Sequence, residues 1–336
     1  MRPGTSLLRS RWLGFAVSAG TLALLVVHVR GQFGGLSLSR FPPAGTIVAV
    51  VVLNVVANLV LALTWRRLVA VAGATLGVLP AIRVWGLSQL ARYGIGSAQI
   101  LGRAGAGKVH GLPVTVSVVT TLVEIGWQFS LTVALATATL PWWGGDAPAL
   151  EAVALLGVVP LLVLLMATLA PSWLLSSTGA LLEPLLRRRF DGRFTDRLRA
   201  ISMSRATSLR LTASYALNSV LRLTAFLLLV RAFGGDLGAE LLRFLGAYAA
   251  GQVAGRVAVL APGGIGPREA VTVLILSPAL GAGPALLLVT VSRALEIAAE
   301  AAFFVITALW PAGRAAAVRG PALDHPPTSG TPGRER

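Results

Sequence analysis

The sequence predicts an all-α integral membrane protein that crosses its bilayer several times, and three observations support this fold class. Apolar residues make up 55% of the chain and charged residues only 12%, whereas soluble domains are about a quarter charged. Several apolar runs reach the roughly 20 residues that a spanning helix needs. The arginines concentrate in short segments between these runs. Because a backbone in lipid has no water to bond, each run is predicted to be a helix.

About eight helices, including broken or re-entrant segments, are predicted from the hydrophobic runs. In chain order they span residues 12–30, 46–64, 112–140, 150–170, 208–231, 241–260, 270–283 and 285–310. The first run lacks a small-residue cleavage site, so it is expected to be a retained helix rather than a signal peptide.

Two segments are not expected to be simple spanning helices. Residues 68–111 are only moderately apolar, and Ser277-Pro278 interrupts the run 270–280. The residues expected to break the first of these segments are Pro80, Gly86, Gly94, Gly96 and Gly102. Apolar runs this short are typical of re-entrant or interfacial segments.

The distribution of charge predicts the orientation of the chain. The outer loops 141–149 and 232–240 carry acidic residues and no basic residue, whereas the segments on the other side carry the arginines and Lys108. By the positive-inside rule, both termini are expected in the cytoplasm. The predicted domains are a transmembrane domain over residues 1–312 and a disordered cytoplasmic tail over residues 313–336.

Several other classes of function are disfavoured. The net charge of +16 does not indicate a nucleic-acid partner, because the arginines occupy positions where orientation signals belong. The chain has no cysteine and three scattered histidines, which disfavours a metal centre. The segment from Gly102 to Lys108 is similar to a phosphate-binding loop, but Val109 stands where the hydroxyl that binds magnesium belongs. No nucleotide, metal or other cofactor is therefore expected.

Polar residues recur at helical spacing inside several apolar runs, so the members of each set share one helix face. A charge facing lipid costs about 3 kcal/mol on insertion scales. These faces are therefore expected to point toward one another or toward a wet cavity. The charged and amide residues singled out in this way are Glu124, Arg222, Gln252, Arg293, Glu296 and Glu300, and Asn54 and Asn58 form a further pair. A functional interior and internal charge pairing that only stabilises the bundle remain open as alternatives.

A turn rich in glycine and proline follows the predicted helix 241–260. It ends in Arg268 and Glu269, at the start of the next apolar run. Glycine lets a backbone approach a ligand closely, and the free N–H groups at a helix start favour an anion. A substrate site is therefore predicted, with an ordinary loop as the alternative. Its residues are Arg268, Glu269, Gly263, Gly264, Gly266 and Arg256, with Arg103 and Tyr93 from a similar segment in the first half.

Two further patterns concern the arrangement of the helices. Each glycine-containing segment follows a long helix, at 46–64 and at 241–260. Paired interrupted segments of this kind predict a two-fold internal repeat and mark the binding site of many transporters. Gly251 and Gly255 form a small-xxx-small pattern, which predicts close packing of the helix that carries them.

At these residues the chain resembles the flippase-like membrane domain of lysylphosphatidylglycerol synthases. The resemblance is carried by Pro262-Gly263-Gly264-Ile265-Gly266 with Arg268-Glu269, and by the segment from Gln89 to Arg103. That family often has Tyr-x-Pro-Gly in the first motif, where this sequence reads Tyr93-Gly94-Ile95-Gly96. Full-length synthases add a soluble aminoacyl-transferase domain, which is not expected here.

The resemblance implies a protein of the bacterial inner membrane that moves a phospholipid or a lipid-linked amphipath between leaflets. Arg268 would engage an anionic headgroup, assisted by Arg256 and Arg103, and the expected partner is a membrane lipid. Two alternatives stay open: a membrane-embedded enzyme that modifies a lipid, and an accessory subunit of an envelope lipid or glycan pathway. An enzyme would need paired carboxylates or a histidine near the interface, and these are sparse. Homo-oligomerisation is also left open.

Overall fold

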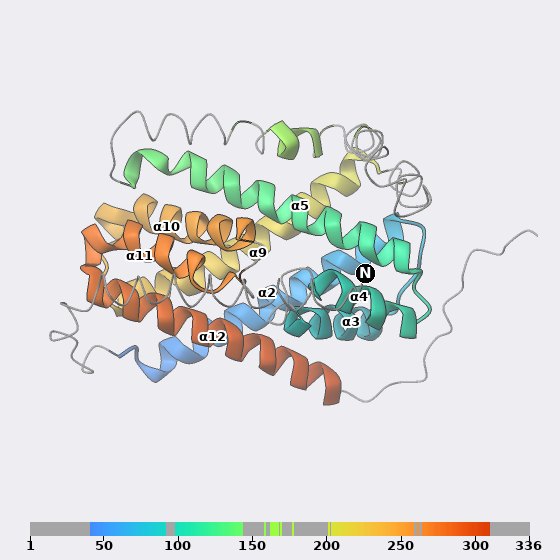
Figure 1. Ribbon diagram of the computed structural model, residues 1–336, viewed down its shortest axis with the longest axis horizontal. Helices are drawn as coiled ribbons and strands as arrows, with labels where there is room; N and C mark the ends of the chain where they lie inside the picture. Colours follow the sequence, from blue (N-terminus) through green and yellow to red (C-terminus); the bar gives the residue numbers. More distant parts are fainter. Residues whose placement is uncertain are drawn as a thin grey trace, which may run out of the picture.

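The computed structural model describes residues 41–91, 98–143, 158, 162–167, 169, 177, 201, 203–258, 261 and 264–309. These residues form a bundle of α-helices without a strand (Figure 1), which confirms the predicted fold class. The predicted helix 12–30, most of the predicted helix 150–170 and the predicted tail lie outside them. The elements in chain order are α2 (Ala44–Val71), α3 (Val78–Ala91), α4 (Ala98–Val109), α5 (Val114–Ala138), the 3-10 turn η3 (Leu140–Trp142), α9 (Arg205–Ala232), α10 (Leu237–Val257), α11 (Pro267–Leu280) and α12 (Ala282–Leu309).

Three of the described helices, α2, α5 and α9, are long and apolar enough to cross a membrane. The 28 residues of α2 rise about 1.5 Å each, which gives roughly 42 Å and exceeds the roughly 30 Å of a bilayer's hydrocarbon core. The predicted ranges 46–64, 112–140 and 208–231 fall on these helices. α12 also has 28 residues but carries Arg293, Glu296 and Glu300 in its apolar sequence.

The prediction that residues 68–111 and 270–280 are not simple spanning helices is confirmed, because α3, α4 and α11 have only 14, 12 and 14 residues. The positions of some breaks differ: α3 and α4 run through Gly86 and Gly102, and α11 runs through Ser277-Pro278. Gly94 and Gly96 lie outside the described residues. Pro80 lies in the first turn of α3, where a missing N–H and a fixed φ are tolerated. α11 passes through Pro278 and ends at Leu280, just before Gly281 with φ +83°.

Two of the glycines predicted to break helices instead allow helices to pack. A Cβ atom on Gly86 of α3 would lie 3.3 Å from the ring of Phe303 on α12. A Cβ atom on Gly102 of α4 would lie 2.9 Å from the Cβ atom of Ala91 on α3. In membrane proteins small residues mark such close approaches, because apolar burial alone does not drive helices together in lipid. The segment from Gly102 to Lys108 is α-helical throughout, as part of α4.

The helix contacts follow a two-fold pattern. Exchanging α2 with α9, α3 with α10, α4 with α11 and α5 with α12 converts the contact α3–α4 into α10–α11, α4–α5 into α11–α12, and α5–α10 into α12–α3. In Figure 1 the pair α3–α4 lies at the opposite end of the bundle from α10–α11, and α5 and α12 lie on opposite edges. The predicted repeat is therefore present. The positions of the two glycine segments had indicated that the predicted helices 46–64 and 241–260, now α2 and α10, correspond. In the structure α2 corresponds to α9 instead.

α2 and α9 run in opposite directions through the centre of the bundle (Figure 1). Near the end of α2, Arg67 donates to the hydroxyl of Ser214 in the early part of α9, at 3.4 Å. Two apolar clusters flank this central pair. One surrounds Trp65 and Trp85, and the other surrounds Phe226 and Phe244. Each cluster comes mainly from one half of the repeat, with a few residues of the other half, such as Tyr215 in the first cluster and Val50 in the second.

Candidate functional site

A central cavity of about 260 Å³ lies between the two halves. Each described α-helix contributes to its wall, from Leu61 of α2 to Glu296 of α12. The charged side chains that line it are Glu124, Arg222, Arg256, Arg268, Arg293 and Glu296. Arginines outnumber glutamates in this lining, so the central cavity is a cationic space inside an apolar bundle.

The structure brings many of the predicted site residues to the central cavity. Those that line it are Glu124, Arg222, Gln252, Arg256, Gly264, Arg268, Arg293 and Glu296. Those that do not line it, although described, are Arg103, Gly266, Glu269 and Glu300. Glu300 is buried on α12 with 3% of its surface exposed. Tyr93 and Gly263 lie outside the described residues.

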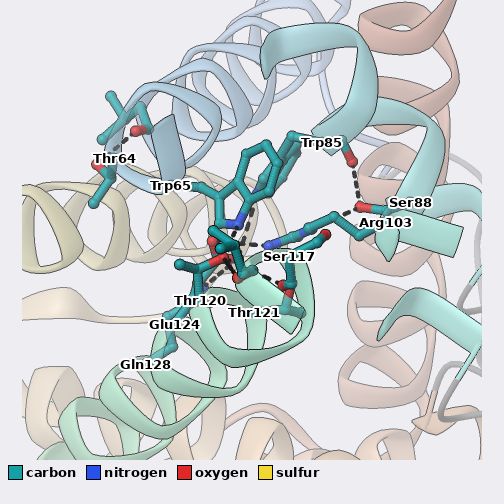
Figure 2. A network of polar contacts seen from close by, with 12 residues as sticks. Thr64, Trp65, Trp85, Ser88, Arg103, Ser117, Thr120, Thr121, Glu124 and Gln128 are labelled. Carbon is teal, nitrogen blue, oxygen red and sulfur yellow. Dashed lines mark hydrogen bonds and ion pairs between the residues drawn. The ribbon is translucent and has the colours of Figure 1, made fainter. Parts of the chain in front are cut away.

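Arg103 and Glu124 form the centre of a buried network at the α3–α4 end of the bundle (Figure 2). Arg103 Nη1 lies 3.0 Å from Glu124 Oε2, and the side chains are 0% and 1% exposed. Arg103 Nε donates to the Ser88 hydroxyl at 3.1 Å, and Trp85 Nε1 donates to the Glu124 carboxylate at 3.3 Å. The guanidinium also stacks against Trp65, 5.1 Å from the ring centroid, a cation–π geometry. These contacts hold Arg103 behind the wall of the central cavity, away from any substrate inside it.

The hydroxyl groups around this pair serve the helix rather than the central cavity. Thr120 donates to the carbonyl of Val116 at 2.8 Å and accepts from Trp65 Nε1 at 3.1 Å. Thr121 donates to the carbonyl of Ser117 at 2.6 Å. The polar stripe of α5 is thus largely satisfied within the protein, which is the internal-bonding alternative for its serine and threonine members.

A second ion pair lies at the equivalent place in the other half. Arg268 of α11 donates through Nη1 and Nη2 to both carboxylate oxygens of Glu296 on α12, at 2.8 Å and 2.6 Å. Arg293 adds a bond of 3.2 Å to the same carboxylate. The Arg268 and Glu296 side chains are 14% and 6% exposed and line the central cavity. The arginine predicted to bind substrate is therefore engaged by a carboxylate of the protein in this conformation.

The glycine turn before α11 is shaped by two positive φ angles, +70° at Gly264 and +99° at Gly266. A Cβ atom on Gly264 would lie 2.7 Å from the carbonyl oxygen of Gly255 on α10. The carboxylate of Glu269 accepts from the N–H of Gly266 at 2.6 Å. Glu269 thus accepts from one of the N–H groups at the helix start that were predicted to favour an anionic ligand, and it caps its own helix. A Cβ atom on Gly255 would lie 3.0 Å from that of Arg268, so the small-xxx-small pattern serves close packing as predicted.

Arg222 of α9 is held differently from the paired arginines. Its Nε donates to Asn218 Oδ1 at 3.2 Å, its Nη1 to Asn54 Oδ1 at 3.3 Å and its Nη2 to Asn58 Oδ1 at 2.7 Å. Asn54 donates in turn to the carbonyl of Val50 at 2.9 Å, which fixes the direction of its own oxygen. We refer to Arg222 with these three asparagines as the asparagine cradle. Its two sides come from α2 and α9, the central helices of the repeat.

The sequence analysis placed Arg222, Asn54 and Asn58 on polar helix faces but did not predict that these residues meet. The sequence does contain a pattern that predicts this contact. The segment Leu53-Asn54-Val55-Val56-Ala57-Asn58 has the same pattern as Leu217-Asn218-Ser219-Val220-Leu221-Arg222. Because the two segments lie on helices that the repeat exchanges, residues at matching positions are expected to face each other across the centre.

The fold and the central cavity define a polytopic helical membrane protein with a charged interior shared between two structural halves. The family model described as the lysylphosphatidylglycerol synthase TM region matches residues 11–303, and the chain belongs to this family. Membership indicates a membrane protein of lipid metabolism or lipid transport. Comparison with curated proteins gave no match, and neither did comparison with solved structures.

Proposed function

We propose that the protein moves a phospholipid or a lipid-linked amphipath between the leaflets of its membrane. The observation that carries this proposal is the central cavity, a polar space walled by helices of both halves inside a bundle of membrane helices. Ionisable residues inside a membrane are costly and generally mark a pathway for a polar substrate. An internal repeat with a polar site between its halves is the architecture of many transporters.

The size of the central cavity supports a polar headgroup as the part of the substrate that enters. Its volume of about 260 Å³ is slightly below the roughly 300–1,000 Å³ of pockets that enclose a whole small molecule. Acyl chains would remain in the surrounding hydrocarbon, where they lose no apolar contact. In the proposed setting, the inner membrane of a bacterium, both termini face the cytoplasm.

In this proposal, the ion pair between Arg268 and Glu296 opens when a substrate binds. A headgroup that carries a negative charge competes with Glu296 for the Arg268 guanidinium, because both are oxyanions that suit its planar fork. Arg293 also donates to Glu296, so the Glu296 carboxylate would still have a cationic partner after Arg268 leaves. Exchange of partners at Arg268 would therefore couple substrate binding to the loss of an ion pair that joins α11 to α12.

The test is translocation of fluorescent lipids in proteoliposomes, with anionic, zwitterionic and aminoacylated headgroups compared. The wild-type protein is expected to translocate lipid at a rate that depends on the headgroup. Arg268→Ala is expected to abolish that movement while the protein still elutes as a folded species in size-exclusion chromatography. Arg243→Ala is the matched control, since this arginine is on α10 and pairs at 2.9 Å with Glu240, away from the central cavity lining.

Two results would count against the proposal in different ways. Translocation by Arg268→Ala at the wild-type rate would remove Arg268 from the site. Absence of movement of any lipid by folded wild-type protein, with and without an ion gradient, would overturn translocation itself and favour a lipid-modifying enzyme or an accessory subunit.

A further inference from the structure

The four arginines that line the central cavity differ in the groups that hold them. Arg268 and Arg293 share Glu296, and Arg293 Nε also lies 3.8 Å from the Glu269 carboxylate. Arg256 donates to the hydroxyl of Thr132 at 2.8 Å. Glu124 is already paired with an arginine behind the wall. Glu296 also interacts electrostatically with Arg222. Within the described part of the chain, however, the close ion pairs of the cavity carboxylates are made with arginines other than Arg222.

All three hydrogen bonds described for Arg222 end on neutral amide oxygens. Amide oxygens fix the direction of a guanidinium without cancelling its charge. The three asparagines are themselves 1–4% exposed, so the cradle is built into the interior of the protein. An aspartate at Asn58 would have the same shape and would neutralise the cation, yet the chain has an amide there. Among the described residues, four arginines and two glutamates line the central cavity, and one of these glutamates, Glu124, is paired with Arg103. Because excess charge at membrane depth is costly, this arrangement is explained if a ligand supplies further negative charge.

We infer that the asparagine cradle is an oxyanion-binding site, and that its ligand is the phosphate group of an amphipath whose headgroup enters the central cavity. A tetrahedral phosphate suits a guanidinium that is already oriented. The guanidinium lies at the wall of the central cavity, next to the crossing of α2 and α9. This inference deepens the proposed function, and the choice of a lipid as the ligand rests on that function. The primary contact for the anion is then Arg222 rather than Arg268.

The shared chemistry is a phosphate oxyanion, which could come from a lipid headgroup or from phosphate in solution. Binding is followed as a ligand-dependent shift in the thermal unfolding of purified full-length protein in detergent. The probes are dioctanoyl phosphatidylglycerol, inorganic phosphate, and dioctanoyl glycerol, which has the same chains without a phosphate. The wild type is expected to be stabilised by the phosphatidylglycerol and not by dioctanoyl glycerol. Stabilisation by inorganic phosphate at equal or lower concentration would identify a soluble oxyanion as the ligand.

Two variants of the asparagine cradle test the site. Arg222→Gln is expected to weaken phosphatidylglycerol binding about tenfold or more, as expected for loss of a charge-assisted hydrogen bond. Asn58→Asp is the sharper variant, because it keeps Arg222 and adds a carboxylate 2.7 Å from its Nη2. It is expected to fold at least as stably as the wild type and yet to lose phosphate binding. A purely structural Arg222 would gain stability in this variant with no change in binding.

Arg231→Gln is the matched control, since Arg231 is exposed on the same helix, outside the central cavity. Its binding is expected to equal that of the wild type. Unchanged phosphatidylglycerol binding in Asn58→Asp, or no binding of either phosphate probe to the wild type, would overturn the inference.

Lipid translocation measured on the same proteins separates this inference from the proposed function. If the wild type binds phosphatidylglycerol through Arg222 but moves no lipid, the oxyanion site stands and the translocase proposal fails. If the wild type moves lipid and both cradle variants bind and move it equally well, the translocase proposal stands and the oxyanion site fails.

Discussion

The helix pairs α3–α4 and α10–α11 occupy equivalent places in the repeat, and each carries an arginine that pairs with a glutamate on the next helix. In the first pair, both side chains are almost fully buried, Arg103 lies against tryptophans behind the wall, and only Glu124 belongs to the cavity lining. In the second, Arg268 and Glu296 form a bidentate pair at the wall of the central cavity. The comparison teaches that equivalent positions in a repeat can hold the same ion pair for different purposes. Because the first pair is almost fully buried, we interpret it as a structural element. Because both members of the second pair line the central cavity, a ligand can replace one of them.

The largest expected difference between the two pairs is in stability. Glu124→Gln leaves the Arg103 charge buried without its carboxylate, which costs about 3–5 kcal/mol when a partner is removed from a buried pair. Glu296→Gln is expected to cost clearly less, because Arg268 faces the central cavity and can be solvated there. Chemical unfolding of both variants in detergent measures the difference. Equal losses would contradict the division into a structural pair and an accessible pair.

A double substitution sharpens this result. Arg103→Met combined with Glu124→Gln removes both charges and keeps an acceptor oxygen for Trp85 Nε1. Replacement of a buried ion pair by apolar residues of similar volume is frequently neutral or stabilising. The double variant is therefore expected to regain much of the stability lost in Glu124→Gln.

A second expected effect concerns how closely each pair of helices packs. A Cβ atom on Gly251 of α10 would overlap the hydroxyl of Thr272 on α11 and lie 3.0 Å from the carbonyl oxygen of Arg268. Gly251→Ala is therefore expected to destabilise the protein by about 1–3 kcal/mol, the usual cost of overpacking. Gly126→Ala on α5 is the control, because no atom lies within 4 Å of its Cβ position, and it should be neutral or slightly stabilising.

Gly102→Ala makes the same test in the first helix pair, where the new Cβ atom would meet that of Ala91 at 2.9 Å. If both pairs depend on close approach, this variant is also destabilised in thermal unfolding. A loss confined to Gly251→Ala would show that only α10 and α11 need their glycine contact.

The smallest expected effect separates hydroxyl groups that join two helices from those that bond only their own. Thr120→Val removes the acceptor of Trp65 Nε1 and is expected to cost about 0.6–1.7 kcal/mol, as interhelical hydrogen bonds in membranes do. Thr272→Val removes only a bond to the carbonyl of Arg268 within α11, so a smaller change is expected. Unfolding midpoints in detergent compare the two, and a larger loss in Thr272→Val would contradict this division.

The sequence predicted which helix faces are polar, because residues three and four apart share a face whatever the fold. Glu124, Arg222, Gln252 and Glu296 accordingly line the central cavity. The sequence did not predict the partner of each charge. Arg268 was expected to bind substrate, yet its partner in this conformation is Glu296 on the next helix. Spacing within a helix does not determine which of several acceptors on neighbouring helices comes within reach.

The errors in helix prediction have a related physical cause. Glycine and proline lower helix propensity in water, and Pro80, Gly86 and Gly102 were therefore expected to be among the break points, although they lie within α3 and α4. Inside a membrane bundle Gly86 and Gly102 gain the close packing of a neighbouring helix, and the tertiary contact outweighs the local preference. The two glycine segments do correspond in the repeat, because one lies between α3 and α4 in the sequence and the other between α10 and α11. The pairing of the long helices was missed because α3 was not predicted as a helix and the matching asparagine patterns of α2 and α9 were not compared.

The asparagine cradle also bears on how the chain enters its membrane. An arginine at the centre of an isolated helix raises the free energy of insertion by about 3 kcal/mol, and Arg222 is part of α9. The amide of Asn58 that receives its Nη2 belongs to a helix 164 residues earlier in the chain. During synthesis α2 is therefore already available when α9 emerges, and it offers two of the three oxygens that satisfy the guanidinium. The first half of the repeat acts in this way as an insertion partner for the second, and the order of the two halves along the chain favours assembly.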